Sequence, residues 1–167
     1  PKNLGQGILI QSYAKDEIPQ MDIEIINSII FNQIQEVGYN PKVYLNKDLK
    51  QSTLSEEYNF FCKDDECASQ NAMLLNAKYV LVWEFAESKD LFYIRIFDPM
   101  NYSDWIAEDI LSNPYKVLSE SGIYGLDPLV RTSVTKVMSV RNFKNEISAF
   151  NRFKMKNKVL VEWGKYP

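Results

Sequence analysis

The sequence predicts one α/β (α+β) domain, in which helices pack on a mixed sheet of about five strands in the order β-α-β-α-β-β-β-α. Helical segments separate the first strands, as parallel pairing requires, whereas short polar connections join the later strands, as in an antiparallel meander. A chain of 167 residues, 46% apolar and 25% charged, suits one domain with one core. We expect this domain at residues 1–141, followed by a C-terminal tail or linker at 142–167.

The N-terminal third contains the clearest periodic pattern. Residues 7–10 form a short apolar run whose period Tyr13 continues, and they are interpreted as a buried strand. Within 22–37, isoleucines recur at helical spacing before Gly38, so this segment is predicted as an amphipathic helix with a C-terminal stop. Residues 41–45 are predicted as a short strand.

The middle of the chain is more polar. Residues 46–59 are rich in Lys, Ser and Glu without a clear period, which favours an exposed loop. Asp64 and Asp65 stand where helix N-caps belong, and Glu66 adds negative charge to the first turn. A short helix is therefore predicted from this point to about Asn76.

Three strands are predicted in succession, at 78–85, 91–97 and 104–111. Asp127 followed by Pro128 then indicates an N-cap and a first helical position, so a third helix is predicted to run to about residue 140. Within the tail, 158–163 is interpreted as a further strand.

The two cysteines, Cys62 and Cys67, are five positions apart, and such a pair suits a disulfide. Two free buried thiols in a cytosolic protein are the alternative. A zinc site is the weakest hypothesis, because it needs about four ligands and the chain has no histidine. As a disulfide, the bond would be a local staple worth about 2 kcal/mol.

The composition excludes several kinds of chemistry. Without histidine, the Ser-His-Asp and Cys-His constellations cannot form, and neither a GxxxxGK[ST] nor a GxGxxG pattern occurs. A net charge of −3 and a pI near 5.1 argue against nucleic-acid partners. The longest apolar stretches, 25–31 and 79–82, are far short of the ~20 residues that cross a bilayer. We therefore expect neither an enzyme nor a cofactor.

Successive residues of a strand point to opposite faces of the sheet, and in 79–85 and 91–97 apolar residues occupy both the odd-numbered and the even-numbered positions. Both faces of the predicted meander are therefore apolar. Helices can cover one face. The other face, which is expected to carry Trp83, Phe85, Tyr93 and Phe97, must be covered by more of the chain or remain a partner site. The alternative to a partner is coverage by tail residues Phe150, Phe153, Leu160 and Trp163. The candidate partner-binding residues are Tyr58, Phe60, Phe61, Trp83, Phe85, Tyr93, Arg95 and Phe97.

The tail is basic and aromatic. Its cations could meet an anionic surface such as lipid headgroups, and the interleaved Phe and Met residues would also suit RNA stacking. A solvated terminal segment is the default interpretation. The abrupt start at Pro1 is interpreted as a processed or trimmed beginning, which leaves room for a preceding signal peptide or lipid anchor. The cations concerned are Arg141, Lys144, Arg152, Lys154, Lys156 and Lys158.

Residues 60–98 resemble the TolB amino-terminal-like domains of bacterial envelope proteins and lipoproteins. In those domains the pattern "C…CA…lgAdyvlvg" leads into a strand pair ending in "D…tG". Here FFCKDDECA begins at Phe60, AMLLNAKYVLVW begins at Ala72, and the second strand ends at Asp98. The element order agrees from Ile8 to Met138, about four-fifths of the chain. The turn glycine of the family is absent after Asp98, and nothing beyond residue 141 matches.

The resemblance implies an anticodon-binding-domain-like fold in a periplasmic or outer-membrane-tethered domain without enzymatic activity. Similar domains in TolB, FlgO-like flagellar lipoproteins and LpoB-type synthase activators dock onto other envelope proteins. The leading hypothesis is therefore an envelope adaptor that binds protein through 46–61, the aromatic sheet face, or both. One alternative is a structural subunit of an oligomeric secretion or flagellar assembly, since CsgG-like relatives build rings. The other is a hydrolase using carboxylates in a cleft.

Overall fold

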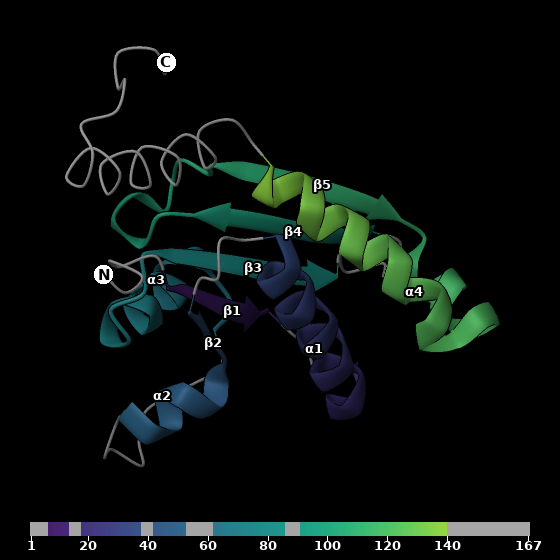
Figure 1. Ribbon diagram of the computed structural model, residues 1–167, viewed down its shortest axis with the longest axis horizontal. Helices are drawn as coiled ribbons and strands as arrows, with labels where there is room; N and C mark the ends of the chain where they lie inside the picture. Colours follow the sequence, from purple (N-terminus) through teal and green to yellow (C-terminus); the bar gives the residue numbers. More distant parts are fainter. Residues whose placement is uncertain (1–6, 14–17, 38–41, 53–61, 86–90, 140–167) are drawn as a thin grey trace, which may run out of the picture.

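The computed structural model describes residues 7–13, 18–37, 42–52, 62–85 and 91–139 (Figure 1). A five-stranded mixed sheet runs through these residues in the order β2-β1-β3-β4-β5, which confirms the predicted fold class. Its strands are β1 (Ile8–Ser12), β2 (Val43–Tyr44), β3 (Tyr79–Phe85), β4 (Leu91–Phe97) and β5 (Ala107–Ser112). The tail 142–167, with its predicted strand at 158–163, lies outside the described residues, so the boundary at 141 stays a prediction.

The sheet combines the two kinds of pairing that the sequence predicts. β1 is parallel to β2 and to β3, and helices occupy the connections between these strands. β3, β4 and β5 then pair antiparallel. The 3-10 helix η1 (Pro99–Asn101) follows Asp98, whose Oδ1 accepts from the Met100 backbone N at 2.8 Å. Because this turn precedes the last strand, β5 begins at Ala107, later than the predicted 104.

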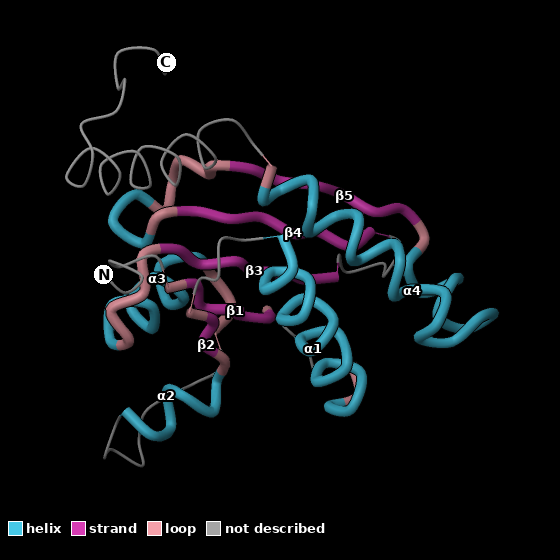
Figure 2. Tube along the Cα trace, in the orientation of Figure 1, coloured by secondary structure: helices cyan, strands magenta, loops and turns pink. Residues whose placement is uncertain are grey.

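Helices lie on both faces of the sheet (Figures 1 and 2). α1 (Gln20–Val37) and α4 (Pro114–Met138) cover one face, where isoleucines of α1 and valines of α4 pack on alternate residues of β1, β3 and β4. A second core on the opposite face joins α2 (Asn46–Ser52) and α3 (Asp65–Leu74) to β1 and β3. Within the described ranges, no helix is long and apolar enough to cross a membrane.

The prediction of an exposed loop over 46–59 is wrong for its first half, because 46–52 form α2. The backbone N of Leu45 donates to Asp48 Oδ2 at 2.7 Å, and the backbone N of Asp48 donates to the Leu45 carbonyl at 2.9 Å. Leu49 is fully buried in the second core. One apolar anchor on a single short helix produces no periodic pattern, which is why the sequence did not reveal it.

The predicted start of the last helix at Asp127 is also wrong. α4 begins at Pro114 and has non-helical backbone angles at Gly122, with φ 65° and ψ −166°. Asp127 lies inside the helix, where it forms an ion pair with Arg131 one turn later, and Pro128 is likewise internal. The kink divides α4, so the apolar stripe after the kink resembled a separate helix with its own N-terminal signals.

Candidate partner-binding site

Arg95 of β4 is the centre of a polar cluster on the face of the sheet that carries α3. It is only 7% exposed, and its guanidinium lies between two carboxylates. Nη2 lies 2.9 Å from Asp65 Oδ1, and Nη1 lies 3.3 Å from Glu84 Oε1. Two ion pairs therefore compensate a cation that burial alone would disfavour.

Asp65, the first residue of α3, joins that helix to β4, to the residue that follows β1 and to the segment that precedes β5. In addition to its bond with Arg95, Oδ1 accepts from the Tyr13 hydroxyl at 2.6 Å, and Oδ2 accepts from Trp105 Nε1 at 2.9 Å. Asp64 is the residue that caps the helix, because its Oδ1 accepts from the Cys67 backbone N at 2.8 Å. The sequence expectation of capping is thus confirmed for Asp64, while Asp65 serves the cluster.

Two aromatic rings flank the guanidinium. Its Cζ lies 4.5 Å from the centroid of the Trp105 ring and 5.5 Å from that of Tyr13. Both distances lie within the range of cation–π attraction, which strengthens when the cation is desolvated. Arg95 is therefore held by charge at its ends and by rings at its faces.

The protonation states of the cluster follow from burial and from these partners. Burial, reinforced by the hydrogen bond to Asp65, raises the pKa of the Tyr13 hydroxyl well above its ordinary value. For Arg95, burial acts to lower the pKa, but the hydrogen bond and charge of Asp65, with the charge of Glu84, outweigh it and the pKa is raised. Tyr13 is therefore neutral and Arg95 cationic near neutral pH.

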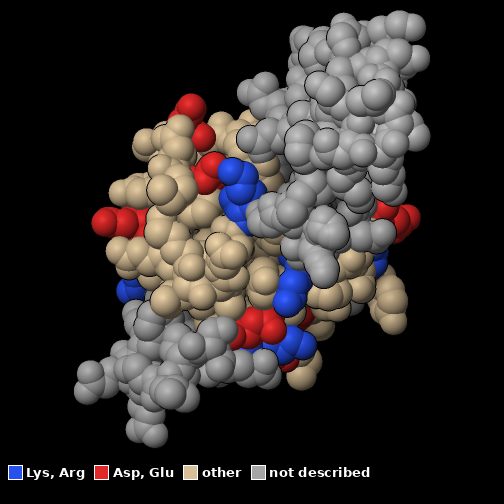
Figure 3. Space-filling view, turned by 60° about the vertical axis from the view of Figure 1, so that its left-hand side comes forward, with Lys and Arg blue, Asp and Glu red and all other residues tan. Residues whose placement is uncertain are grey.

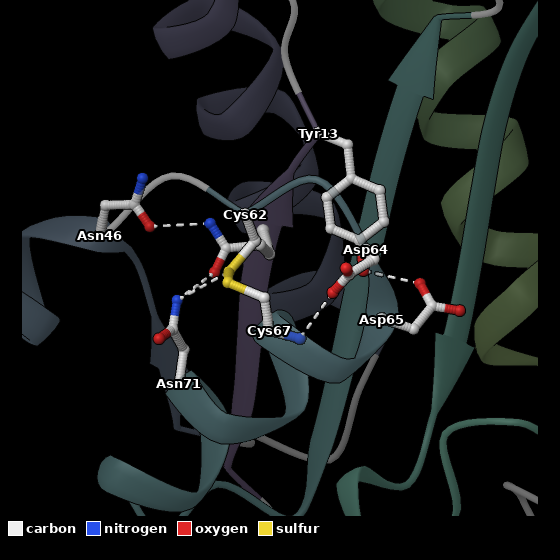
Figure 4. Close-up of a disulfide and its surroundings, with 8 residues drawn as sticks. Tyr13, Asn46, Cys62, Asp64, Asp65, Cys67 and Asn71 are labelled. Atoms are coloured by element: carbon white, nitrogen blue, oxygen red, sulfur yellow. Dashed lines mark hydrogen bonds between the residues drawn. A yellow bond between two sulfur atoms is a disulfide. The ribbon is translucent and has the colours of Figure 1, made fainter. Parts of the chain in front are cut away.

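A disulfide between Cys62 and Cys67, with an S–S distance of 2.01 Å, holds the start of α3 (Figure 4). The predicted bond is confirmed, and the alternative of free thiols is wrong. Asn71 Nδ2 donates to Cys62 Sγ at 3.2 Å and to Gln11 Oε1 at 3.0 Å, and Gln11 Nε2 donates to Asn46 Oδ1 at 3.1 Å. The amide chain thus connects α2, β1 and α3, and the disulfide fixes Cys62, which precedes α3, to the first turn of that helix.

An open hollow of about 490 Å³ lies over this cluster. On the side of the molecule that Figure 3 shows, acidic and basic side chains lie next to one another among mostly uncharged residues. Among the described residues, four carboxylates and two cations line the hollow, so this lining has an excess of negative charge. Trp105 is 43% exposed at its edge, beside Tyr102, which is also exposed. The lining residues are Tyr13, Lys63, Asp64, Asp65, Glu66, Glu84, Arg95, Tyr102, Ser103 and Trp105.

The candidate residues taken from the sequence divide between the two faces of the sheet. Opposite residues of paired strands share a face, and Trp83 pairs with Ile94 and Phe85 with Phe92. Trp83 and Phe85 are consequently buried beneath α1 and α4, where the Trp83 Nε1 donates to Asn27 Oδ1 at 2.7 Å. The expectation that they share a face with Tyr93 and Phe97 is wrong.

The remaining candidates differ in accessibility. Phe97 is fully buried in the core beneath α3, and Tyr93 is half-buried on the same face as Arg95. Of the five candidates that the structure describes, Arg95 alone lines the hollow. Tyr58, Phe60 and Phe61 lie outside the described residues.

Sequence reasoning missed Tyr13, Asp65 and Trp105 as members of one site. Tyr13 was interpreted as a strand residue, Asp65 as a cap, and Trp105 as part of a strand. One signal was available: Trp105 follows a polar connection, where an aromatic side chain has no core to enter. The local sequence contains no other indication that β1, β4 and α3 bring these side chains together.

The cluster offers little chemistry of its own. Tyr13 is neutral, Arg95 is paired twice, and the Asp65 carboxylate accepts three hydrogen bonds, so none of these groups is free to move a proton. Within the described ranges, no three His, Cys, Asp or Glu side chains are grouped so as to hold a metal ion. What the arrangement provides is a rigid surface with exposed aromatic edges.

Comparisons with known proteins leave the family open. No family model matches the chain, and no curated protein matches it. One solved structure that the chain resembles is the PelC dodecamer from Paraburkholderia phytofirmans. It is 18% identical, and the match covers 81% of this chain and 85% of that one with a TM-score of 0.44. A second is a point variant of the same dodecamer, 16% identical, with a match that covers 80% of this chain and 86% of that one and has a TM-score of 0.44. At that TM-score the likeness assigns neither fold nor function to this chain.

Proposed function

We propose that this chain is a non-enzymatic protein-interaction domain of the bacterial cell envelope, located in the periplasm or at the outer membrane, and that it docks a partner at the hollow around Trp105. The observation that carries the proposal is the buried Arg95–Asp65 pair beneath the exposed Trp105 ring, fixed in place by the Cys62–Cys67 disulfide. That the chain belongs to the TolB-like family is a further hypothesis.

The disulfide supports the compartment. Disulfides persist in oxidising compartments and are rare in the cytosol, where thiols are kept reduced. Cys62 is buried, and Asn71 donates to its sulfur at 3.2 Å, so the bond is integrated in the core of the domain. A bond built into the structure in this way favours a protein that folds outside the cytosol.

The preorganisation of the hollow supports docking. Trp, Tyr and Arg are the residues that most often dominate binding energy at protein interfaces, and the hollow is lined by all three. Trp105 is fixed through its Nε1 bond to Asp65, and Arg95 by its carboxylates, so binding would immobilise few additional rotors. Rigidity before binding lowers the entropy cost of association.

The charge of the hollow indicates the kind of partner. Asp64, Glu66 and Glu84 lie around it in addition to Asp65, against Lys63 and the already paired Arg95. Electrostatic complementarity therefore favours a partner segment that presents Lys or Arg beside an apolar side chain able to contact the Trp105 ring. Such a segment would bind less well at high salt.

The test is quantitative affinity capture from an envelope extract of the source organism, with three immobilised proteins: the native chain, Trp105→Ala, and Tyr124→Ala as a control. Tyr124 is exposed on α4, away from the hollow. We expect at least one envelope protein that the native chain and Tyr124→Ala retain equally and that Trp105→Ala loses. Equal retention of every captured protein by all three would refute docking at this hollow.

The hydrolase alternative gains little from the geometry. Carboxylates that act on a glycosidic bond face each other across a cleft. Here the hollow is open, and its most buried carboxylate, Asp65, is occupied by three donors. An assembly subunit remains compatible with a docking surface; sedimentation of the purified chain would separate a ring from a monomer.

A further inference from the structure

We infer that residues 142–167 fold back, within the same chain, onto the face of β4 and β5 opposite α4. This goes beyond the proposed function, because it makes the C-terminal segment part of the folded domain in place of a linker. The surface concerned, called here the open strip, consists of Leu91, Tyr93, Glu108, Ile110 and Ser112. Tyr93 pairs with Ile110 and Leu91 with Ser112, so these residues lie side by side on one face.

The open strip is apolar at its centre and lacks a cover among the described residues. On the opposite face, Phe92, Ile94 and Ile96 of the same strand are fully buried beneath the helices. On the strip's face, α3 packs on β1, β3 and η1. Ile110 is consequently 47% exposed, directly beside the half-buried ring of Tyr93. A sheet face of this kind normally receives a packing layer.

The chain leaves the described domain at the β5 edge of the sheet, on the face opposite the open strip. The C-terminal end of α4 lies beside the start of β5 (Figure 1), and Val137 and Met138 share a core with Ala107. Ten extended residues reach about 33 Å, whereas a six-residue strand such as β5 is about 20 Å long. The segment therefore starts at the edge of the sheet that borders the strip, and it is long enough to pass around β5 and to cross the strip.

Charge complementarity favours residues 142–167 as the occupant of the open strip. Residues 142–167 contain six Lys or Arg and two Glu, a net charge of +4, and the whole chain carries −3, so residues 1–141 carry −7. Glu108 lies on the strip, and Glu84, opposite Tyr93, lies at its border. Apolar residues that suit the strip alternate with cations in 152–156, and 158–163 is mostly apolar.

A second copy is a less favourable occupant. Its own acidic domain would approach the same acidic surface, and like charges repel. A segment attached to the same chain, in contrast, is present at an effective concentration in the millimolar range. Both arguments favour coverage of the open strip by the C-terminal segment of the same chain.

The experiment is photo-cross-linking of the full chain with benzoylphenylalanine in place of Ile110, and in place of Tyr124 as a control on the other side of the molecule. Equal amounts of ¹⁴N- and ¹⁵N-labelled protein are mixed, irradiated and digested, and linked peptides are identified by mass spectrometry. Circular dichroism checks that both substituted proteins remain folded. We expect position 110 to link to peptides of 142–167 of the same isotope, and position 124 not to do so.

A second variant tests the electrostatic argument. Changing Arg152, Lys154 and Lys156 to Glu should lower the yield of the link from position 110 severalfold. Changing the exposed Lys47, Lys116 and Lys136 to Glu, with the same change in net charge, should leave the yield as it was. Links of mixed isotope would show a second copy on the strip, and no link above the position 124 background would show a strip left open for another protein. Either result, or equal yields from the two charge variants, would overturn the inference.

Discussion

Arg95 Nη2 lies 2.9 Å from Asp65 Oδ1, and this buried ion pair joins β4 to the first residue of α3. The helix is short, and at its N-terminus it depends on this pair, on the Asp64 cap and on the disulfide for its position. Because Trp105 and Tyr13 donate to the same carboxylate, the pair also fixes the two rings that border the hollow.

Replacing Arg95 by Met should destabilise the domain by about 3 kcal/mol, because it leaves Asp65 and Glu84 without their buried cation. Urea unfolding followed by circular dichroism measures the free energy. Lys78→Met is the control: its ion pair with Asp98 is more exposed, so its loss should cost less than about 1 kcal/mol. Similar costs for the two substitutions would contradict the central role given to Arg95.

The disulfide should contribute about 2 kcal/mol, since it closes a short ring in the unfolded chain. Reductant should lower the melting temperature of the native chain toward that of a variant with both Cys62 and Cys67 changed to Ala, and should not affect that variant. Alkylation before and after reduction, read by mass, provides the thiol count. A native chain that takes up alkylating reagent without reduction would argue against the bond and against the proposed compartment.

The fold could be predicted from the sequence because its main elements carry their own patterns. The isoleucines of α1 recur at helical spacing, and β3 and β4 are continuous runs of mostly apolar residues that place apolar side chains on both faces of the sheet. The site could not be predicted in the same way. Tyr13 directly follows β1, Asp65 begins α3 and Arg95 lies in β4, and only the sheet order, with β1 beside β3 and β3 beside β4, brings them together.

The disulfide and the Asp64 cap were predictable because both are local in sequence. The faces of Trp83 and Phe85 were not, because they depend on the β3–β4 register, which a one-residue shift would reverse. Register is set by the connection and by packing together, and neither is visible in an isolated strand.

Substitution of Leu49 tests whether α2, which its polar sequence did not predict, packs on the core. Leu49 is fully buried in α2, and Leu49→Ala should cost about 2–4 kcal/mol through lost contacts and a residual cavity. Leu129→Ala, at a position on α4 that is partly exposed, should cost less than about 1 kcal/mol. Urea unfolding compares them, and equal values would mean that α2 does not dock on the core through Leu49.

Gly122 tests the kink in α4. Its backbone, with φ 65° and ψ −166°, occupies a region that is essentially restricted to glycine, although no atom lies within 4 Å of a Cβ added there. Gly122→Ala should therefore cost about 1–3 kcal/mol through backbone strain alone. Ser121→Ala, at the exposed neighbouring position, should be close to neutral or slightly stabilising. If Gly122→Ala were neutral as well, α4 would be continuous at this point.

Tyr13 should make the free energy of unfolding depend on pH in the alkaline range. Its folded pKa is raised by burial and by the bond to Asp65, so above about pH 10 the unfolded chain loses this proton while the folded chain keeps it. Below that pH, Tyr13→Phe should cost about 1 kcal/mol for the lost hydrogen bond. Above it, the native chain should lose this advantage at up to about 1.4 kcal/mol per pH unit, so the difference between the two proteins shrinks. Urea unfolding of both at about pH 8, 10 and 11 measures this, and a difference that stayed constant or grew would show that the hydroxyl ionises in the folded state as readily as in the unfolded chain.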